Sequence, residues 1–470
     1  MLDPDFGWHI EMGQLILRSG IPATDPFSYT MPSFPFVDHE WGINVFMFLI
    51  YKYFGWIFMS ILFSMSSIFA VLIPFKGNLK SYFLLPFVFA GGSLLFFTGI
   101  RPQVATWLLF SILILIFNES KYYKKIRLLL PLFFLFWANL HGGFPIGIAV
   151  YLLFLLSKFY EKRKLDFIDL ALFASSVLVT LINPYGIRLW QEVWMQMSDS
   201  SLRWNIMEWR PGVFSFYPAV LGLFAFSFSF LLTFRKKFTL FEKALYFCLL
   251  MAGLSSIRHV PFWVIATIPI LLKGLIFLSE KAGKIKYGKE RFNKAYKFSV
   301  ILALIFVLIP LLSEHTNPFL VNEENVYPKK AVKFLKKNPT SGEVYSTYGW
   351  GGYLIWKMPS KKVFIDGRMP SWRWNKNIQG ESNYAFKDYL SLDGEGVKFE
   401  PTAKKYKITT VLLPYQKDNK KNINKLTAWL LNKQDKKDKK KKIEDIYTKL
   451  RKERWKIIYQ DEISVIYRKN

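Results

Sequence analysis

Long apolar runs separated by short polar connections make up the chain from residue 55 to residue 313. Because a helix rises about 1.5 Å per residue, a run of roughly 17 to 22 apolar residues can cross the hydrocarbon core of a bilayer. By this criterion we expect about ten spanning helices, at residues 55–75, 81–99, 103–118, 127–140, 143–159, 167–184, 213–234, 239–257, 260–279 and 297–313. The pattern predicts an all-α membrane bundle over residues 55–313.

The chain before this bundle has a different pattern. The stretch from Asp3 to Trp41 is too polar to enter a bilayer and too rich in aromatic and titratable residues to be a plain spacer. Residues 42–54 are apolar but short, and Lys52 interrupts them. Such a segment favours a helix that lies in the membrane interface. We therefore take residues 1–54 as an external loop with an interfacial helix.

The last part of the chain, residues 314–470, has the composition of a soluble domain and mixes helix and strand patterns. The expected elements are a helix at Pro328–Lys337, strands at Glu343–Ser346, Lys362–Asp366 and Thr409–Leu413, a helix near Asn424–Leu431, a helix ending near Arg454, and strands around Ile457 and Val465. These patterns predict a small α/β domain. Its Lys-rich segment, residues 433–442, is expected to be a solvated loop.

Composition agrees with a membrane protein, since 52% of residues are hydrophobic, 18% are aromatic and only 21% are charged. A formal net charge of +29 would favour nucleic-acid binding in a soluble chain. Here the basic residues are not interleaved with aromatic residues on a soluble face, so we predict no nucleic-acid partner. The single cysteine, Cys248, lies in an apolar run and provides neither a disulfide framework nor a cysteine metal site.

The charges also predict an orientation. Every second connection between the expected helices is rich in Lys and Arg. By the positive-inside rule these connections are cytoplasmic, which places residues 1–54 and the C-terminal domain outside a multi-pass protein of the cell (inner) membrane. Met1 and Leu2 could not translocate an external segment, so we expect a first helix upstream of Met1. The alternative is that the first loop crosses the bilayer unaided.

Polar residues other than plain Lys and Arg gather in the connections predicted to be external. They include Arg101, His141, Glu208, Arg258 and His259. Polar groups at a membrane edge are costly unless they face a cavity or one another, so the set predicts a polar site on that side. Each motif also has a purely structural interpretation, as a helix end, a headgroup anchor or a packing residue.

The opening loop has the most distinctive chemistry. Asp3 and Asp5 form a D-x-D pair beside His9. Such a pair can share a divalent cation, Mg or Mn, through oxygen ligands, or one carboxylate can act as a general base. Alternatively, these acids cap the helix that follows. Asp38, His39 and Glu40 are open to the same two interpretations, although three consecutive titratable groups exceed what capping requires.

Several motifs together resemble a known family. They are DPDFGWHIEMGQLILRSGIPATDPFS, VDHEW, IRPQ, NLHGGF, NPYG, EWRP and YGWGGYLIW followed by VFIDGR. The series resembles bacterial multispanning proteins placed with the GT-C membrane glycosyltransferases, and more distantly the catalytic subunits of oligosaccharyltransferases. In that comparison Asp3-Pro4-Asp5-Phe6 is similar to the loop that holds the catalytic carboxylate, and Tyr348–Tyr353 is similar to the W-W-D-Y-G motif.

The resemblance implies a GT-C fold and transfer of a sugar from a polyprenyl-phosphate donor at the membrane lipid to an acceptor on the outer face. It implies Asp3, Asp5 and His9 as catalytic residues, with Asp3 and Asp5 as metal ligands. The expected substrate-binding residues are Asp38, His39, Glu40, Arg101, His141, Glu208, Arg258, His259, Trp350, Tyr353, Asp366 and Arg368. The chain departs from that pattern at two points: Gly351 replaces the W-W-D-Y-G aspartate, and a second acidic motif is not evident.

A second hypothesis comes from another class of protein, a transporter or lipid-handling membrane protein without transfer chemistry. Inverted repeats and paired broken helices, which mark many transporters, are not visible in the sequence. Convergence of the predicted site residues in space would favour the glycosyltransferase, whereas a tunnel open to both sides and far from the acidic loop would favour the transporter.

Overall fold

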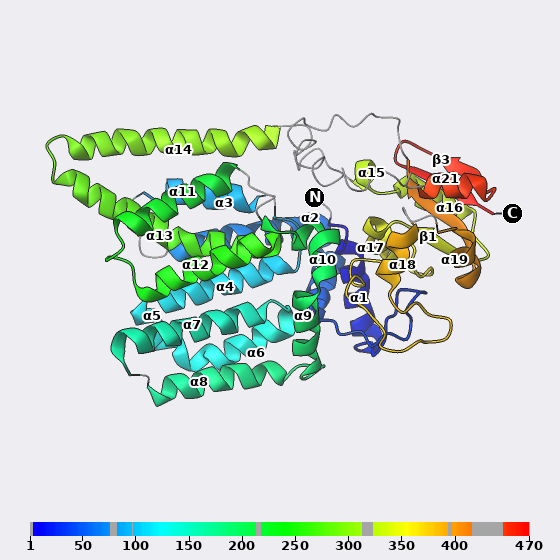
Figure 1. The fold of residues 1–470 in the computed structure, drawn as a ribbon, viewed down its shortest axis with the longest axis horizontal. Helices are drawn as coiled ribbons and strands as arrows, with labels where there is room; N and C mark the ends of the chain where they lie inside the picture. The colour runs from blue at the N-terminus through cyan, green and yellow to red at the C-terminus, as the bar shows by residue number, and fades with distance from the viewer. Residues whose placement is uncertain are drawn as a thin grey trace. The chain divides into compact units, whose positions relative to one another are not determined.

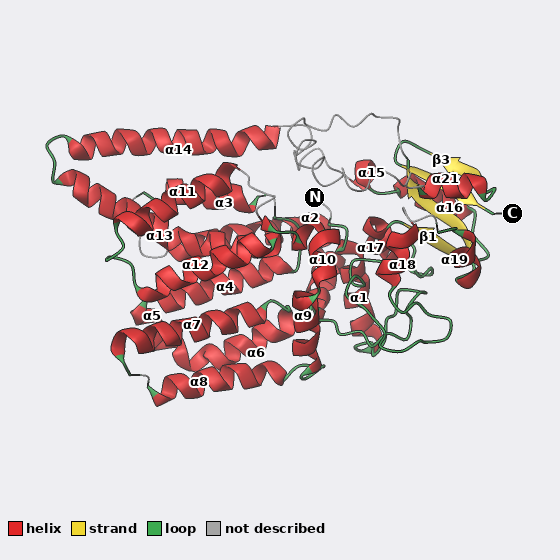
Figure 2. Ribbon diagram, in the orientation of Figure 1, coloured by secondary structure: helices red, strands yellow, loops and turns green. Residues whose placement is uncertain are grey.

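A computed structural model describes residues 3–75, 82–95, 97–164, 166–212, 218–312, 323–392, 397–415 and 445–469. The chain forms two compact units. The first comprises residues 1–3, 12–21 and 37–321, and the second comprises residues 4–11, 22–36 and 322–470. The first unit is helical, whereas the strands of the described residues all lie in the second (Figure 2).

Helices of the first unit follow the predicted apolar runs. They are α2 (Trp41–Leu72), α3 (Leu84–Leu94), α4 (Gln103–Asn118), α5 (Ser120–Ile126), α6 (Leu130–Leu140), α7 (Phe144–Lys162), α8 (Phe167–Leu178), α9 (Arg188–Ser198), α10 (Ser200–Asn205), α11 (Pro218–Thr233), α12 (Leu240–Ser255), α13 (Val260–Gly283) and α14 (Gly288–Leu312). Short 3-10 turns join several of them: η1 (Ile73–Phe75), η2 (Arg127–Leu129), η3 (Val179–Leu181), η4 (Met207–Trp209) and η6 (Ile257–His259). Helices α4, α6, α7, α8 and α12 lie side by side (Figure 1).

The predicted number of spanning helices was too high. A helix overlaps each predicted range, but within the described residues only three are long and apolar enough to cross a membrane: Trp41–Phe75, Phe144–Lys162 and Ile257–Gly283. The pair Gln103–Asn118 and Ser120–Leu140, bent by 109°, makes a fourth if it counts as one span. Among the described residues, the prediction of about ten spanning helices is therefore corrected to three or four.

Length explains the difference. Helix α3 has 11 residues, which at the rise of an α-helix extends only about 16 Å, roughly half the hydrocarbon core. In the run 167–184, α8 ends at Leu178 and η3 continues only to Leu181. The apolar runs are therefore longer than the helices they contain, because residues outside the helix are apolar as well.

One helix contains a break at a glycine. The ranges 42–54 and 55–75, predicted as separate helices, are joined in α2, and Gly55 interrupts it with φ 77° and ψ 176°. Positive φ is a conformation that glycine adopts without steric cost. The neighbouring side chains of Phe54 and Trp56 are exposed.

The second unit is built on a four-stranded sheet. Its strands are β1 (Glu343–Ser346), β2 (Ile408–Pro414), β3 (Lys456–Gln460) and β4 (Ser464–Arg468), in the order β1-β2-β4-β3. β1 and β2 are parallel, and the other two pairs are antiparallel. The helices are α15 (Glu323–Val326), α16 (Lys329–Lys337), α17 (Gly351–Lys357), α18 (Ala385–Leu392), α19 (Glu400–Lys405) and α21 (Ile446–Lys452), with η7 (Tyr348–Trp350) leading into α17. Helix α16 packs against β3 and β4.

Most sequence-predicted elements of this region are confirmed, with one exception. The predicted strand Lys362–Asp366 forms only an isolated parallel bridge, between Val363 and Ser28, and is not a strand of the sheet. Its pairing partner comes from the polar N-terminal segment, which the local pattern could not reveal. The helix predicted at 424–431 and the Lys-rich segment 433–442 lie outside the described residues.

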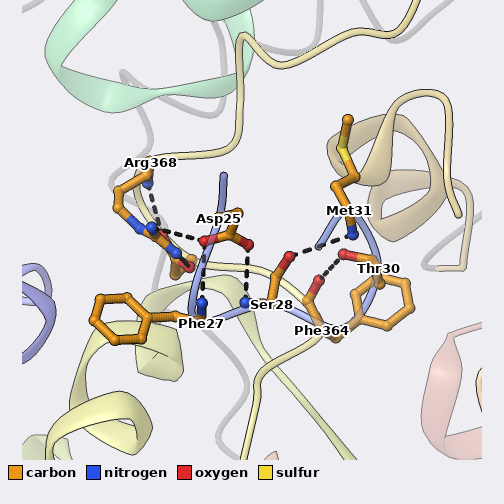
Figure 3. Close-up of polar contacts among 8 residues, drawn as sticks. Asp25, Phe27, Ser28, Thr30, Met31, Phe364 and Arg368 are labelled. Carbon is orange, nitrogen blue, oxygen red and sulfur yellow. Dashed lines mark hydrogen bonds and ion pairs between the residues drawn. The ribbon is translucent and has the colours of Figure 1, made fainter. Parts of the chain in front are cut away.

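The polar N-terminal segment, residues 22–36, is part of the second unit. The Val363 amide donates to the Phe27 carbonyl at 2.9 Å, and the Tyr29 amide donates to the Val363 carbonyl at 3.1 Å. The Thr30 hydroxyl donates to the Phe364 carbonyl at 2.7 Å (Figure 3). A segment interpreted as a membrane-proximal loop is thus a structural part of the C-terminal α/β fold.

Helix α1 (Phe6–Ser19) begins in the second unit, where its first turn packs closely on α17. A Cβ atom built on Gly7 would lie 2.0 Å from the Gly352 carbonyl oxygen, and one built on Gly352 would lie 2.3 Å from the Pro4 carbonyl oxygen. Both obstacles are backbone atoms, which cannot rotate away. The two glycines therefore allow the backbones to approach.

Replacing Gly7 with alanine is expected to destabilise the second unit by about 1–3 kcal/mol, because the added methyl group forces the two backbones apart. Thermal unfolding and trypsin resistance of the full chain in detergent measure the effect. Gly349→Ala is the matched control, since a Cβ at Gly349 meets no atom within 4 Å. Equal stability of the two variants would contradict the close packing.

Candidate active site

A cavity of about 390 Å³ opens in the first unit. Six of the predicted site residues line it: His39, Arg101, His141, Glu208, Arg258 and His259. They come from the segments just before α2 and α4, the connection from α6 to α7, η4 and η6. The structure therefore brings these residues together, although they are spread over more than two hundred positions of the sequence.

Helix direction explains this convergence. The connection from α6 to α7 contains His141, and the connection from α12 to α13 contains Arg258 and His259. Arg101 lies just before α4 begins at Gln103. Since all of these helix ends contribute to one cavity, alternate connections of the bundle meet at the same end of the first unit.

Arg101 links two acidic side chains. Its Nε lies 2.5 Å from Asp3 Oδ2, and its Nη1 donates to Glu208 Oε1 at 2.7 Å. Asp3, predicted as a base or metal ligand, is thus held by a guanidinium group, while Glu208 is part of the cavity wall. The two carboxylates offset the charge of Arg101.

Two further arginines give the cavity an excess of positive charge. Arg203 and Arg258 both line it, and within the described residues no carboxylate lies within ion-pair distance of either. The Arg258 guanidinium lies 5.0 Å from the centre of the Trp209 ring, a cation–π arrangement that orients it. Sequence reasoning missed Arg203 and Trp209 as site residues. Only the motif Glu208-Trp209-Arg210-Pro211 indicated the segment.

His141 is held by partners on both sides of its ring. The Gly143 amide donates to its Nδ1 at 2.9 Å, and the Thr106 hydroxyl lies 2.9 Å from the same atom. On the other side, Nε2 lies 3.0 Å from Glu40 Oε1. His39 lies near the same carboxylate oxygen, with its Nε2 3.8 Å from Glu40 Oε1.

Asp38 lies in the same segment and is buried. Its carboxylate accepts from the Glu40 amide at 3.0 Å and from the Asn44 side chain at 2.8 Å. These contacts fix the chain at the start of α2, in agreement with the structural interpretation of this acid. Glu40 is buried too, and of the three consecutive titratable residues only His39 is among those that line the cavity.

The second unit holds the remaining predicted residues. Arg368 is buried between two carboxylates. Its Nη1 lies 2.9 Å from Asp25 Oδ1 (Figure 3). Its Nε and Nη2 donate to the two oxygens of Asp366 at 2.8 and 2.7 Å. Burial alone would lower the pKa of Arg368, but the charges of Asp25 and Asp366 outweigh it and raise that pKa above its ordinary value. Trp8 and Trp372 are among the rings beside its guanidinium.

Of the other candidates in this unit, His9, Trp350 and Tyr353 are buried and Asp5 is partly exposed. The Trp350 indole donates to the Val326 carbonyl at 3.1 Å, and the Tyr353 hydroxyl donates to Glu323 at 2.8 Å. The His9 ring lies 3.7 Å from the Trp8 ring. The Asp5 carboxylate lies beside Gly367, where a Cβ would come within 1.9 Å of it.

A divalent cation fits the arrangement of the described side chains poorly. Within the described residues no group of three or more His, Cys, Asp and Glu side chains is placed to hold a metal ion. Asp3 is engaged by Arg101. Metal dependence thus stays a prediction of the sequence, and no step below uses a metal.

Comparisons with known proteins give a distant similarity. No protein-family model and no curated protein matches the chain. Among solved structures, the oligosaccharyltransferase of Archaeoglobus fulgidus in its apo form is similar with 12% sequence identity and a TM-score of 0.36, over 87% of this chain and 65% of that one. The chain therefore spans slightly less than two thirds of that protein's length.

Proposed function

We propose that the protein is an integral membrane glycosyltransferase that moves a sugar from a polyprenyl-phosphate carrier to an acceptor on the outer face of the membrane. The observation that carries the proposal is the pair Arg203 and Arg258, which lack carboxylate partners among the described residues and line a cavity in a unit with membrane-spanning helices. Phe97, Ile146 and Phe262 also line that cavity. Cationic groups on an apolar wall suit a phosphate attached to a hydrocarbon chain.

In the proposed reaction an acceptor oxygen forms a bond to the anomeric carbon of the sugar, and the bond from that carbon to the carrier phosphate breaks. Negative charge grows on the leaving phosphate, where preorganised guanidinium groups stabilise it most. Arg258 and Arg203 take this role. Arg101, already bound to Asp3 and Glu208, shapes the wall beside them.

Binding of undecaprenyl phosphate tests this assignment. Arg258→Gln is expected to weaken its binding to the full chain in nanodiscs about tenfold or more, because a hydrogen bond between charged groups is lost. Arg203→Gln should act in the same direction. Tryptophan fluorescence and thermal shift, with undecaprenol as the uncharged ligand, measure the contribution of the phosphate.

Arg210→Gln is the matched control. Arg210 is exposed and lies in the same connection but does not line the cavity, so its replacement should leave the affinity within about twofold. The proposal is wrong if undecaprenyl phosphate binds no better than undecaprenol, or if all three variants bind like the wild type.

A further inference from the structure

A row of neighbouring polar side chains lies at the cavity wall, and the proposed phosphate site does not include it. Five histidines occur in the whole sequence, and three of them, His39, His141 and His259, line this one cavity. Two of the three share a carboxylate, Glu40, whose Oε1 lies 3.0 Å from His141 Nε2 and 3.8 Å from His39 Nε2.

Neighbouring hydrogen-bond donors determine which ring nitrogen of His141 accepts a hydrogen bond. The Gly143 amide has only a proton to offer, so His141 Nδ1 must accept. The Trp137 indole donates to the Thr106 oxygen at 3.0 Å, which leaves the Thr106 hydroxyl proton for His141 Nδ1. With Nδ1 as the acceptor, the proton of a neutral His141 ring lies on Nε2, the atom 3.0 Å from Glu40 Oε1.

Two glycines make room for the imidazoles. A Cβ on Gly142 would lie 2.5 Å from His39 Cδ2, and one on Gly143 would lie 2.6 Å from the Thr106 methyl carbon. The sequence His141-Gly142-Gly143 thus brings the α6–α7 connection against both His39 and Thr106. The two histidine rings lie 6.3 Å apart at an interplanar angle of 77°.

From this geometry we propose that His39 accepts the proton of the acceptor hydroxyl, and that Glu40 and His141 are positioning residues that stabilise its imidazolium form. The inference rests on the proposed function, because it assigns a role within that transfer. Glu40 and His141 are among the charged and titratable groups that face His39, and the same cavity also contains Arg101, Arg203, Glu208, Arg258 and His259.

The step balances without a further reactant. The acceptor O–H bond breaks as the new oxygen–carbon bond forms, and its proton goes to the His39 imidazole. The electron pair of the broken carbon–oxygen bond stays on the carrier phosphate, beside the arginines. The imidazolium and the phosphate then carry opposite charges, and proton release to water restores His39. Glu40 stabilises the charged imidazole in the same way that a carboxylate orients and stabilises other catalytic histidines.

Carbethoxylation of histidine by diethyl pyrocarbonate, followed residue by residue by mass spectrometry, tests the assignment because only neutral imidazole reacts. In the full chain in nanodiscs, Glu40→Gln is expected to lower the midpoint pH of His39 modification by about one unit, since the imidazolium loses its carboxylate. Glu40→Asp keeps the charge and should retain most of the wild-type midpoint. Glu208→Gln is the matched control, because Glu208 lies in the same cavity but pairs with Arg101.

A second measurement uses the wild-type protein alone. Bound undecaprenyl phosphate should slow carbethoxylation of His39 about fivefold or more by covering the cavity wall. Failure of undecaprenyl phosphate to bind overturns the proposed function. Binding without protection of His39, or equal midpoints in the wild type and Glu40→Gln, overturns the role of His39.

Discussion

Replacing Arg368 with alanine is expected to destabilise the second unit by about 3–5 kcal/mol, the largest effect that we expect of any single substitution. The guanidinium is buried and bridges Asp25 and Asp366. Without it, two buried carboxylates face each other with no cation between them. The penalty is therefore the cost of uncompensated charge as well as the loss of the ion pairs.

Trypsin resistance and thermal unfolding of the full chain measure this loss. Lys404→Ala is the control, because Lys404 is 78% exposed in its pair with Glu400, and such pairs contribute little to stability. Adding Asp25→Asn and Asp366→Asn to Arg368→Met should recover part of the stability, since no buried charge then remains. If Arg368→Ala unfolds like Lys404→Ala, the buried network does not stabilise this unit.

Residues 322–470 on their own are expected to stay unfolded. They lack Asp25, the partner of Arg368, and they lack Phe34, whose ring stacks on Trp372 at 4.8 Å. Removing one partner of a buried ion pair costs about 3–5 kcal/mol, and burying a large apolar side chain contributes about 2–3 kcal/mol. Together these losses approach the entire stability of a small domain, about 5–15 kcal/mol.

Fusing residues 22–36 through a flexible linker to residues 322–470 is expected to restore folding, as judged by amide dispersion in NMR spectra and by resistance to trypsin. The same fusion with Asp25→Ala is the control and should remain unfolded. A well-folded fragment 322–470 without the N-terminal segment would show that the segment is only peripheral to this unit.

The sequence predicted the positions of the helices better than it predicted which of them are long enough to span a membrane. Helical patterns located a helix in each apolar run, because apolar periodicity is a local property. They overestimated the spans, because a run such as 167–184 includes residues that form a 3-10 turn after α8 ends at Leu178. The bridge from Ser28 to Val363 was beyond any local pattern, since it joins segments from opposite ends of the chain.

Part of the geometry of the candidate site was predictable from the order of the helices. Alternation of helices placed Arg101, His141 and Arg258 at one end of the bundle, and the cavity contains all three. The pairing of Asp3 with Arg101 depends on side-chain positions that sequence spacing does not reveal. The same is true of the contacts that link Thr106 to Glu40 through His141. Asp25 was not singled out among the acids of the opening segment for the same reason.

The bond from Thr30 to Phe364 joins residues 334 positions apart, which has a consequence for biogenesis. At about 5–20 residues per second, a ribosome needs roughly 17 to 67 seconds to synthesise the intervening chain. During that interval the segment around Thr30 has been made, but its binding site has not. A chaperone or the translocation machinery would have to shield Phe34 and Phe36 meanwhile. An exchange of the C-terminal domain between related genes would also require an exchange of this distant segment.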